Sequence, residues 1–214
     1  MVKIDLHTHS VASHDGSLTE ADYRKILDSG TLDYIAVTDH NTISFAKELN
    51  EKLGAQIVIG EEITTREGEI IGLYLTESVK PGMGAAETVA AIKAQNGLVY
   101  IPHPFETIRK GVKIETLDHI SIGVDIVETQ NGRAVFQNKA KPAEAWAIQH
   151  ARPRAASSDA HGWHGWGRTY TEVEAMPTRA TLTKLLSTAT YKVARPGWRG
   201  ILYPKFNRIR RKRG

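Results

Sequence analysis

Two pairs of side chains that bind metals recur at the same spacing in distant parts of the chain. His7 and His9 stand in the run H-T-H, and Asp159 and His161 stand in the run S-S-D-A-H. In an extended strand the side chains of residues i and i+2 point to the same face, so each pair can bind one ion. A single H-x-H pair is weak evidence, because two histidines at the solvated end of a strand are common. Two such pairs are hard to explain as packing and indicate a metal site.

Further candidate ligands extend this pattern. His40 ends the run T-D-H, and His103 lies in I-P-H-P. The chain has nine histidines and no cysteine, which excludes disulfides, thiolate metal sites and cysteine nucleophiles. Imidazole suits zinc, iron or copper, and carboxylate admits manganese. A mixed cluster of this kind is typical of a hydrolytic site with two or three metals.

Short apolar runs that alternate with helical segments carry these residues. We predict strands at 2–6, 33–38, 56–60, 98–102, 124–128 and 154–158, a hairpin at 63–75, and helices at 20–29, 43–53, 85–95, 138–151 and 179–188. This alternation predicts parallel strands, in either an open doubly wound sheet or a closed barrel. Candidate ligands follow many of the strands, and a barrel brings more strand ends together than an open sheet does. We therefore expect a small α/β barrel of about seven strands, because 214 residues is short for eight.

The composition indicates one globular domain with an uneven charge. Hydrophobic residues make up 41% of the chain and charged residues 24%. No apolar stretch approaches the roughly 18 residues of a membrane span, and the N-terminus lacks the pattern of a signal peptide, so we expect a cytoplasmic protein without membrane contact.

Residues 205–214 contain six basic and no acidic residues, whereas the rest of the chain has 22 basic against 24 acidic residues. We expect a domain at 1–204 and a disordered basic tail at 205–214, which either contacts polyanions or only aids solubility.

Six motifs resemble those of the polymerase and histidinol phosphatase (PHP) family, and they occur in the family's order. They are D-L-H-T-H-S at 5–10, H-D-G-S-L-T at 14–19, A-V-T-D-H-N at 36–41, G-E-E-I-T-T at 60–65, H-P-F at 103–105 and S-S-D-A-H at 157–161. The combination is specific and spans most of the chain. The resemblance implies a distorted, TIM-like (β/α)7 barrel with two or three divalent ions, zinc, manganese or iron, at the C-terminal ends of the strands.

The resemblance also implies which residues bind each ion. The first ion is assigned to His7, His9, Glu62 and Asp159, with Glu62 bridging to the second, which takes His103, while the third is assigned to Asp15, His40 and His161. Many relatives have a further histidine ligand for the second ion, where this chain has Glu69. A carboxylate can replace imidazole and favours a harder ion such as manganese. The alternative is that Glu69 is a solvated turn residue and the second site is weakened.

Neighbouring residues compete for these roles or support them. His14 is a rival for the role of Asp15, because some relatives use histidine in that loop. Glu61 is expected to point to the side of the strand opposite to its neighbour Glu62. Asp39 is expected to orient backbone or a ligand. Glu128 either faces the mouth of the barrel or supports His103.

Cationic and aromatic side chains near the motifs are candidates for substrate binding. Arg109, Arg133 and Arg168 lie in loops that follow strands, where a guanidinium can form two hydrogen bonds with phosphate. Each is also compatible with an ordinary surface position. Trp163 and Trp166 are placed near the same mouth, where they either stack on a base or shield the metals.

These residues predict metal-assisted hydrolysis of a phosphoester. Bound ions lower the pKa of water and neutralise phosphoryl charge, so no side-chain nucleophile is required. The predicted catalytic residues are His40, Asp159 and His161, and the leaving oxygen takes its proton from water or from one of the two histidines. The substrate is a phosphomonoester or phosphodiester, such as a nucleotide or an oligonucleotide end. The alternatives are histidinol-phosphatase-like or amidohydrolase activity on a small metabolite, and a non-catalytic domain that binds metal or nucleic acid.

Overall fold

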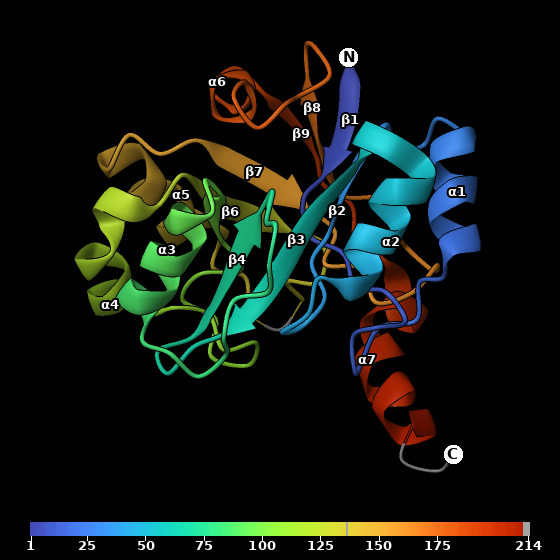
Figure 1. The fold of residues 1–214 in the computed structure, drawn as a ribbon, viewed down its shortest axis with the longest axis horizontal. Coiled ribbons are helices and arrows are strands. Elements are labelled where there is room, and N and C mark those ends of the chain that lie inside the picture. The colour runs from blue at the N-terminus through green and yellow to red at the C-terminus, as the bar shows by residue number, and fades with distance from the viewer. Residues whose placement is uncertain (136, 212–214) are drawn as a thin grey trace.

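One nine-stranded sheet, rolled into a nearly closed barrel, forms the centre of the molecule (Figure 1). The computed structural model describes residues 1–135 and 137–211. The strands are β1 (Val2–Asp5), β2 (Tyr34–Val37), β3 (Ile57–Thr64), β4 (Glu69–Leu73), β5 (Leu98–Ile101), β6 (Ile126–Asn131), β7 (Arg154–Ser157), β8 (Tyr170–Val173) and β9 (Thr190–Lys192). Their order in the sheet is β7-β6-β5-β4-β3-β2-β1-β8-β9.

The strand directions confirm the parallel βα units and correct the strand count. Strands β1, β2 and β3 are parallel to one another, as are β5, β6 and β7. Strand β4 is antiparallel to both of its neighbours, because it returns from β3 as the predicted hairpin. The prediction of about seven strands is wrong for the described sheet, because β8 pairs antiparallel with β1 and β9 pairs antiparallel with β8.

The ends of β1 and β7 approach each other and bring the barrel close to closure. Thr8 and Ala160 form a parallel bridge just beyond these strands. The Asp159 N–H donates to the His7 carbonyl at 2.9 Å, and the His9 N–H donates to the Ala160 carbonyl at 2.8 Å. The two pairs of candidate ligands, which are about 150 residues apart in sequence, are therefore held side by side by backbone hydrogen bonds.

Helices surround the outer face of the sheet, except the C-terminal helix, which stands at one end of the barrel (Figure 1). They are α1 (Glu20–Asp28), α2 (Ser44–Leu53), α3 (Ala85–Ala94), α4 (Ile114–His119), α5 (Ala140–Gln149), α6 (Leu182–Leu186) and α7 (Gly197–Arg211), with short 3-10 turns at Gly54–Gln56 and Ser121–Gly123. Helix α1 begins where expected, because the Thr19 hydroxyl accepts from the Asp22 N–H and the Asp22 carboxylate accepts from the Thr19 N–H. None of the described helices is both long and apolar enough to span a bilayer.

A buried apolar cluster fills the barrel below the polar strand ends. It takes one or more residues from each of the strands β1 to β8, among them Ile4, Tyr34, Val58, Ile71, Tyr100, Ile126, Ala155 and Val173. Two further clusters lie between the sheet and the helices. The ligands that follow β1 and β7 thus stand on a packed and rigid floor.

Helix α7 corrects the predicted basic tail. Residues 205–211 continue a helix that begins at Gly197, so the segment described here is ordered and the predicted boundary at 204 falls inside a helix. Residues 212–214 of the predicted tail lie outside the described residues. The last predicted helix, 179–188, corresponds to the shorter α6.

The core packing gives a prediction for stability. Ile35 on β2 is fully buried against α1 and α2, so Ile35→Ala leaves a cavity and should lower the free energy of unfolding by about 2–5 kcal/mol, measured by urea denaturation. Ile122→Ala is the matched control, because this isoleucine is 93% exposed and its truncation should change stability by less than about 0.5 kcal/mol. Equal effects of the two substitutions would contradict the packing described here.

Candidate metal centre

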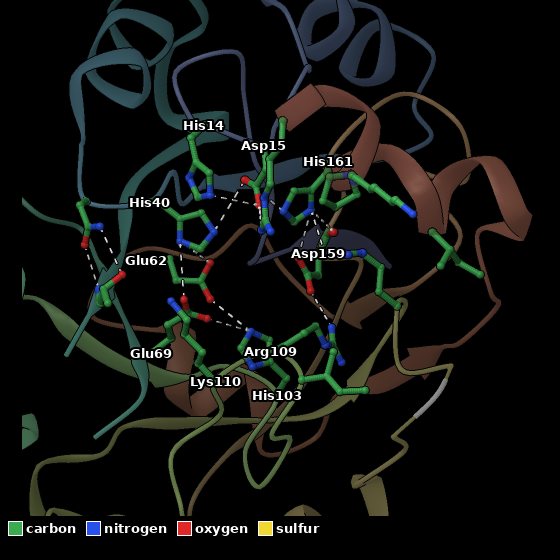
Figure 2. Close-up of a pocket in the computed structure, with 18 of the residues that line it drawn as sticks. His14, Asp15, His40, Glu62, Glu69, His103, Arg109, Lys110, Asp159 and His161 are labelled. Carbon is green, nitrogen blue, oxygen red and sulfur yellow. Dashed lines mark hydrogen bonds and ion pairs between the residues drawn. The ribbon is translucent and has the colours of Figure 1, made fainter. Parts of the chain in front are cut away.

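Seven of the nine predicted ligands line one cavity of about 730 Å³ at the C-terminal ends of the strands (Figure 2), and the other two, His7 and His9, lie within 3.4 Å of the lining residue Glu62. The contributing segments are the loop after β1 (His7, His9, Asp15), the loop after β2 (His40), the strands β3 and β4 (Glu62, Glu69), the loop after β5 (His103) and the loop after β7 (Asp159, His161). All of them are buried except His40, which is partly buried. Residues from six strand ends therefore share one site, as the barrel prediction requires.

The first group of donors surrounds a single point at the base of the cavity. His9 Nε2 lies 3.1 Å from His7 Nε2, 3.2 Å from Glu62 Oε2 and 3.5 Å from Asp159 Oδ1. His7 Nε2 lies 3.4 Å from the same Glu62 oxygen. Donors placed at about 2.0–2.1 Å around a tetrahedral ion are roughly 3.3 Å apart. The spacing of these four side chains therefore fits one divalent ion.

The second group shares Glu62 with the first. The other carboxylate oxygen, Glu62 Oε1, lies 3.2 Å from His103 Nε2, and His7 joins these two residues in a group with metal-binding spacing. Glu69 Oε2 lies 4.0 Å from His103 Nε2. Glu69 is buried, which contradicts the alternative of a solvated turn residue. The two oxygens of Glu62 thus face two adjacent groups, an arrangement that suits a bridging carboxylate.

The third group lies toward the opening of the cavity. Asp15 Oδ1 is 3.5 Å from His161 Nε2 and 3.8 Å from His40 Nε2, and His9 also belongs to this group. The rival residue His14 is largely exposed at the rim, with Nε2 3.7 Å from Asp15 Oδ2. The structure therefore places Asp15 within the third donor group and His14 outside it, at the rim of the cavity.

The charges of the site favour a bound cation. Burial, reinforced by the Glu62 carboxylate, raises the pKa of Glu69 to about 9. Burial would lower the pKa of His9, but hydrogen bonds to Asp159 and Glu62 outweigh it and raise this pKa to about 10. Burial lowers the pKa of His161 to about 3. Carboxylates and imidazoles buried together at this spacing are a donor set suited to divalent metal ions, which displace the protons of groups such as Glu69 and His9 when they bind.

Comparison with known proteins places this chain in a family. No family model matches the sequence. An uncharacterized protein of Methanocaldococcus jannaschii, MJ1587, is 34% identical over 150 residues, which cover 64% of this chain and 88% of that protein. The chain belongs to the family of this archaeal protein.

Solved structures identify the fold. A two-domain protein of Bacteroides vulgatus that contains a predicted PHP-like metal-dependent phosphoesterase aligns with a TM-score of 0.67 at 21% identity, over 97% of this chain and 69% of that one. An amidohydrolase of Chromobacterium violaceum, with bound sulfate and no metal, aligns with a TM-score of 0.62 at 15% identity, over 92% and 99% of the two chains. The fold is that of a PHP-type domain, in agreement with the resemblance of the motifs.

In this PHP-type domain, one buried carboxylate outside the donor groups orients two of the candidate ligands. Glu128 accepts hydrogen bonds from His7 Nδ1 at 3.2 Å, from the His103 N–H at 2.7 Å and from the Tyr100 hydroxyl at 2.9 Å. Because Nδ1 of His7 is engaged in this way, its Nε2 is left as the metal-binding atom. Glu128 therefore supports His103, as one of the two alternatives predicted, and it also positions His7.

Two further predictions about acidic neighbours agree with the geometry. Asp39 accepts from the Ser10 N–H at 2.6 Å and so fixes the loop after β1. Glu61 turns away from the metal groups and accepts from the Val79 N–H at 2.7 Å. Both carboxylates are thus outside the donor groups, and each holds backbone near the site.

The backbone is strained at two ligands. His103 has φ 29° and Asp159 has φ 53°, values that residues with a side chain rarely adopt. The bond from the His103 N–H to Glu128 holds one of these conformations. Gly111 passes so close behind His103 that a Cβ there would lie 2.2 Å from the His103 carbonyl oxygen. Such strain is typical of residues that the surrounding structure holds for function.

Two of the three predicted arginines reach the cavity. Arg109 Nη1 lies 2.6 Å from Asp159 Oδ2, and Arg133 Nη1 lies 3.3 Å from Asp159 Oδ1. Arg168 is not brought to the site, because it is exposed and its Nη1 donates to the Arg195 carbonyl at 3.5 Å. The loop that carries Arg168 follows the candidate ligand His161, but it turns away from the opening of the cavity.

The two tryptophans also lie outside the cavity lining. Trp166 is buried in the core, where its Nε1 donates to Asp5 Oδ2 at 3.1 Å and its ring packs edge-on against Tyr23. Trp163 is covered by the Lys25 ammonium, 4.4 Å from the centre of the ring. The prediction that these rings flank the mouth is therefore wrong.

Three cations in the cavity lining were missed from the sequence. They are Lys110, beside Glu69, and Lys205 and Arg208 on α7. The charge of residues 205–214 predicts a disordered tail for the last two. A signal for the helix was present in the apolar residues Trp198, Leu202, Phe206 and Ile209, which recur at helical spacing through the basic segment.

The third donor group gives a prediction for metal content. Asp15→Ala removes the carboxylate that faces both His40 and His161, so the variant should retain fewer ions per chain than the wild type after manganese loading and gel filtration. Elemental analysis by mass spectrometry measures the difference. His119→Ala, which alters an exposed histidine outside the donor groups, should keep the wild-type content. An unchanged content in Asp15→Ala would remove this residue from the ligands.

The second donor group gives a prediction for metal preference. Glu69→His replaces a hard carboxylate with imidazole, so it should increase the affinity for zinc relative to manganese. Competition titrations of the two metals measure this ratio. An unchanged ratio would show that Glu69 does not contact the metal.

Proposed function

We propose that this PHP-type domain is a metal-dependent phosphoesterase. The observation that carries the proposal is the cavity itself, where overlapping donor groups for adjacent ions lie next to the guanidinium groups of Arg109 and Arg133. Adjacent ions and cationic side chains together suit a substrate with concentrated negative charge. The phosphoesterase described for the structural neighbour from Bacteroides vulgatus supports the same assignment.

The expected metals are two or three divalent ions. His7, His9, Glu62 and Asp159 would hold the first, Glu62, Glu69 and His103 the second, and Asp15, His40 and His161 the third. When bound, divalent ions activate water as a nucleophile and neutralise phosphoryl charge. We assign manganese as the preferred ion, because Glu69 adds a carboxylate to the second group.

The side chains of the domain bind and orient the phosphoester. A guanidinium carries five N–H donors. Arg109 makes four hydrogen bonds, to Glu106, Asn131 and Asp159, which leaves one N–H for a phosphoryl oxygen. Arg133 can keep its bond to Asp159 and still donate to the phosphoester from further N–H groups. Burial lowers the pKa of His40 to about 4 and that of His161 to about 3. Both imidazoles are therefore neutral at pH 7 and suited to bind metal, so we assign the proton for the leaving oxygen to water.

An amidohydrolase is the second candidate, because the neighbour from Chromobacterium violaceum has that activity in its description. That neighbour was solved with sulfate, which has the shape and charge of a phosphoryl group. The cationic lining of the cavity in this chain, with Lys110 next to the two arginines, favours an anionic substrate over a neutral amide. We therefore rank the phosphoesterase first.

A substrate screen with a matched pair of variants tests the proposal. With manganese, zinc or iron added, the wild type should hydrolyse one or more members of a panel of phosphomonoesters, cyclic and linear nucleotides and short oligonucleotides, and should leave acyl amides intact. Asp159→Ala should lower kcat by at least about a thousandfold, because it removes a ligand and the partner of both arginines. Asp28→Ala, at the exposed end of α1, should retain wild-type kcat. Full activity of metal-loaded, folded Asp159→Ala would overturn the assignment.

A further inference from the structure

Helix α7 lies over the opening of the metal centre. It stands at the end of the barrel toward which β1 and β3 point (Figure 1). Five of its residues line the same cavity as the candidate ligands: Ile201, Pro204, Lys205, Arg208 and Ile209. The C-terminal helix is therefore one wall of the site, although it is remote from the ligand motifs in sequence.

Specific contacts hold the helix in this position. Asn207 Nδ2 donates to the Asp15 carbonyl at 2.7 Å and to the His161 carbonyl at 3.1 Å. One side chain thus joins α7 to the backbone of two candidate ligands from different loops. Tyr203 packs on Gly162, where a Cβ would lie 2.6 Å from the ring, so this close approach requires glycine. Asn207 and Tyr203 together fix the register of α7 over the cavity.

The cations of α7 face the cavity with donors to spare. Arg208 Nη2 donates to Asp15 Oδ2 at 2.7 Å, while the side chain of Arg208 remains 54% exposed. Because a guanidinium has five N–H donors, further donors are available to a ligand in the opening. Lys205 lies one turn earlier and lines the same cavity. The described part of α7 contains no acidic residue that would neutralise them.

Apolar side chains of the same helix lie beside these cations. Ile201 and Ile209 contribute to the cavity wall together with Pro204. A wall with both cationic and apolar groups suits an anion that is attached to an organic group, since the cations bind the charge and the aliphatic surface packs on the rest.

We propose that α7 forms an anion subsite of the active centre, in which Arg208 and Lys205 bind a phosphoryl oxygen of an organic phosphoester. Ile201 and Ile209 contact the organic part of this substrate, and Asn207 is the positioning residue that places Arg208. The inference rests on the proposed phosphoesterase function and deepens it. Lys205 and Arg208 thus act as part of the site and not as part of a free tail.

Binding of inorganic phosphate to the full-length, manganese-loaded protein tests the subsite directly. Arg208→Gln should raise the phosphate Kd, measured by calorimetry, by about tenfold or more, because it removes a charge-assisted hydrogen bond. Arg210→Gln is the matched control on the outer face of the same helix and should bind phosphate as the wild type does. Circular dichroism and metal content should be the same for all three proteins. Equal phosphate affinity of the Arg208 and Arg210 variants would overturn the subsite.

A double-mutant cycle tests the role of Asn207. Asn207→Ala should also raise the phosphate Kd, and combining it with Arg208→Gln should add little, because both substitutions remove the same interaction. A merely structural role would instead give additive losses. Additive losses would therefore overturn the positioning role.

Turnover separates this inference from the proposed function. For a hydrolysed phosphoester, Arg208→Gln should raise KM about tenfold or more with a smaller change in kcat. A wild-type protein that binds phosphate through Arg208 and hydrolyses no member of the phosphoester panel would overturn the proposed function and uphold the subsite. A wild type that hydrolyses the panel with the same KM as Arg208→Gln would uphold the function and overturn the subsite.

Discussion

The site depends on the backbone hydrogen bonds that join the ends of β1 and β7. The bonds between Asp159 and His7 and between His9 and Ala160 bring two short ligand pairs from distant parts of the sequence to one point. Because the backbone groups of β1 and β7 are buried, they must be paired, and this pairing fixes the register of the ligands. The remaining donors are then added from the ends of the neighbouring strands around the barrel.

The site is fully buried at its base and accessible to solvent at its rim. At the base, His7 and His9 have no exposed surface, and Glu128 fixes the ring of His7. Toward solvent, Arg109 and Arg133 come from loops, and Arg208 comes from the C-terminal helix. Metal binding requires fixed donors with defined spacing, whereas substrate binding requires cationic side chains that reach the opening of the site. The fold meets both requirements by placing ligands on strand ends and cations on the elements above them.

The convergence of the candidate ligands could be predicted from the sequence because its signals are local. The i, i+2 spacing and the position after an apolar strand are both contained in a few residues, as the pairs at His7 and Asp159 show. The strands β8 and β9 were missed because they are short and follow the last ligand motif. The part of helix α7 beyond residue 204 could not be predicted from charge alone, because six basic residues predict a disordered tail while the apolar residues at helical spacing predict a helix. The bond between His7 and Glu128 joins residues 121 positions apart, so only the folded chain reveals it.

We propose that the strand ends hold adjacent divalent ions above a packed barrel. Anomalous diffraction from crystals grown with manganese measures the positions of such ions directly. We expect adjacent peaks, one between His9 and Asp159 and others toward Glu62 and toward His161. Crystals of manganese-saturated protein that show no anomalous peak at these residues, or peaks only on the outer surface, would contradict it.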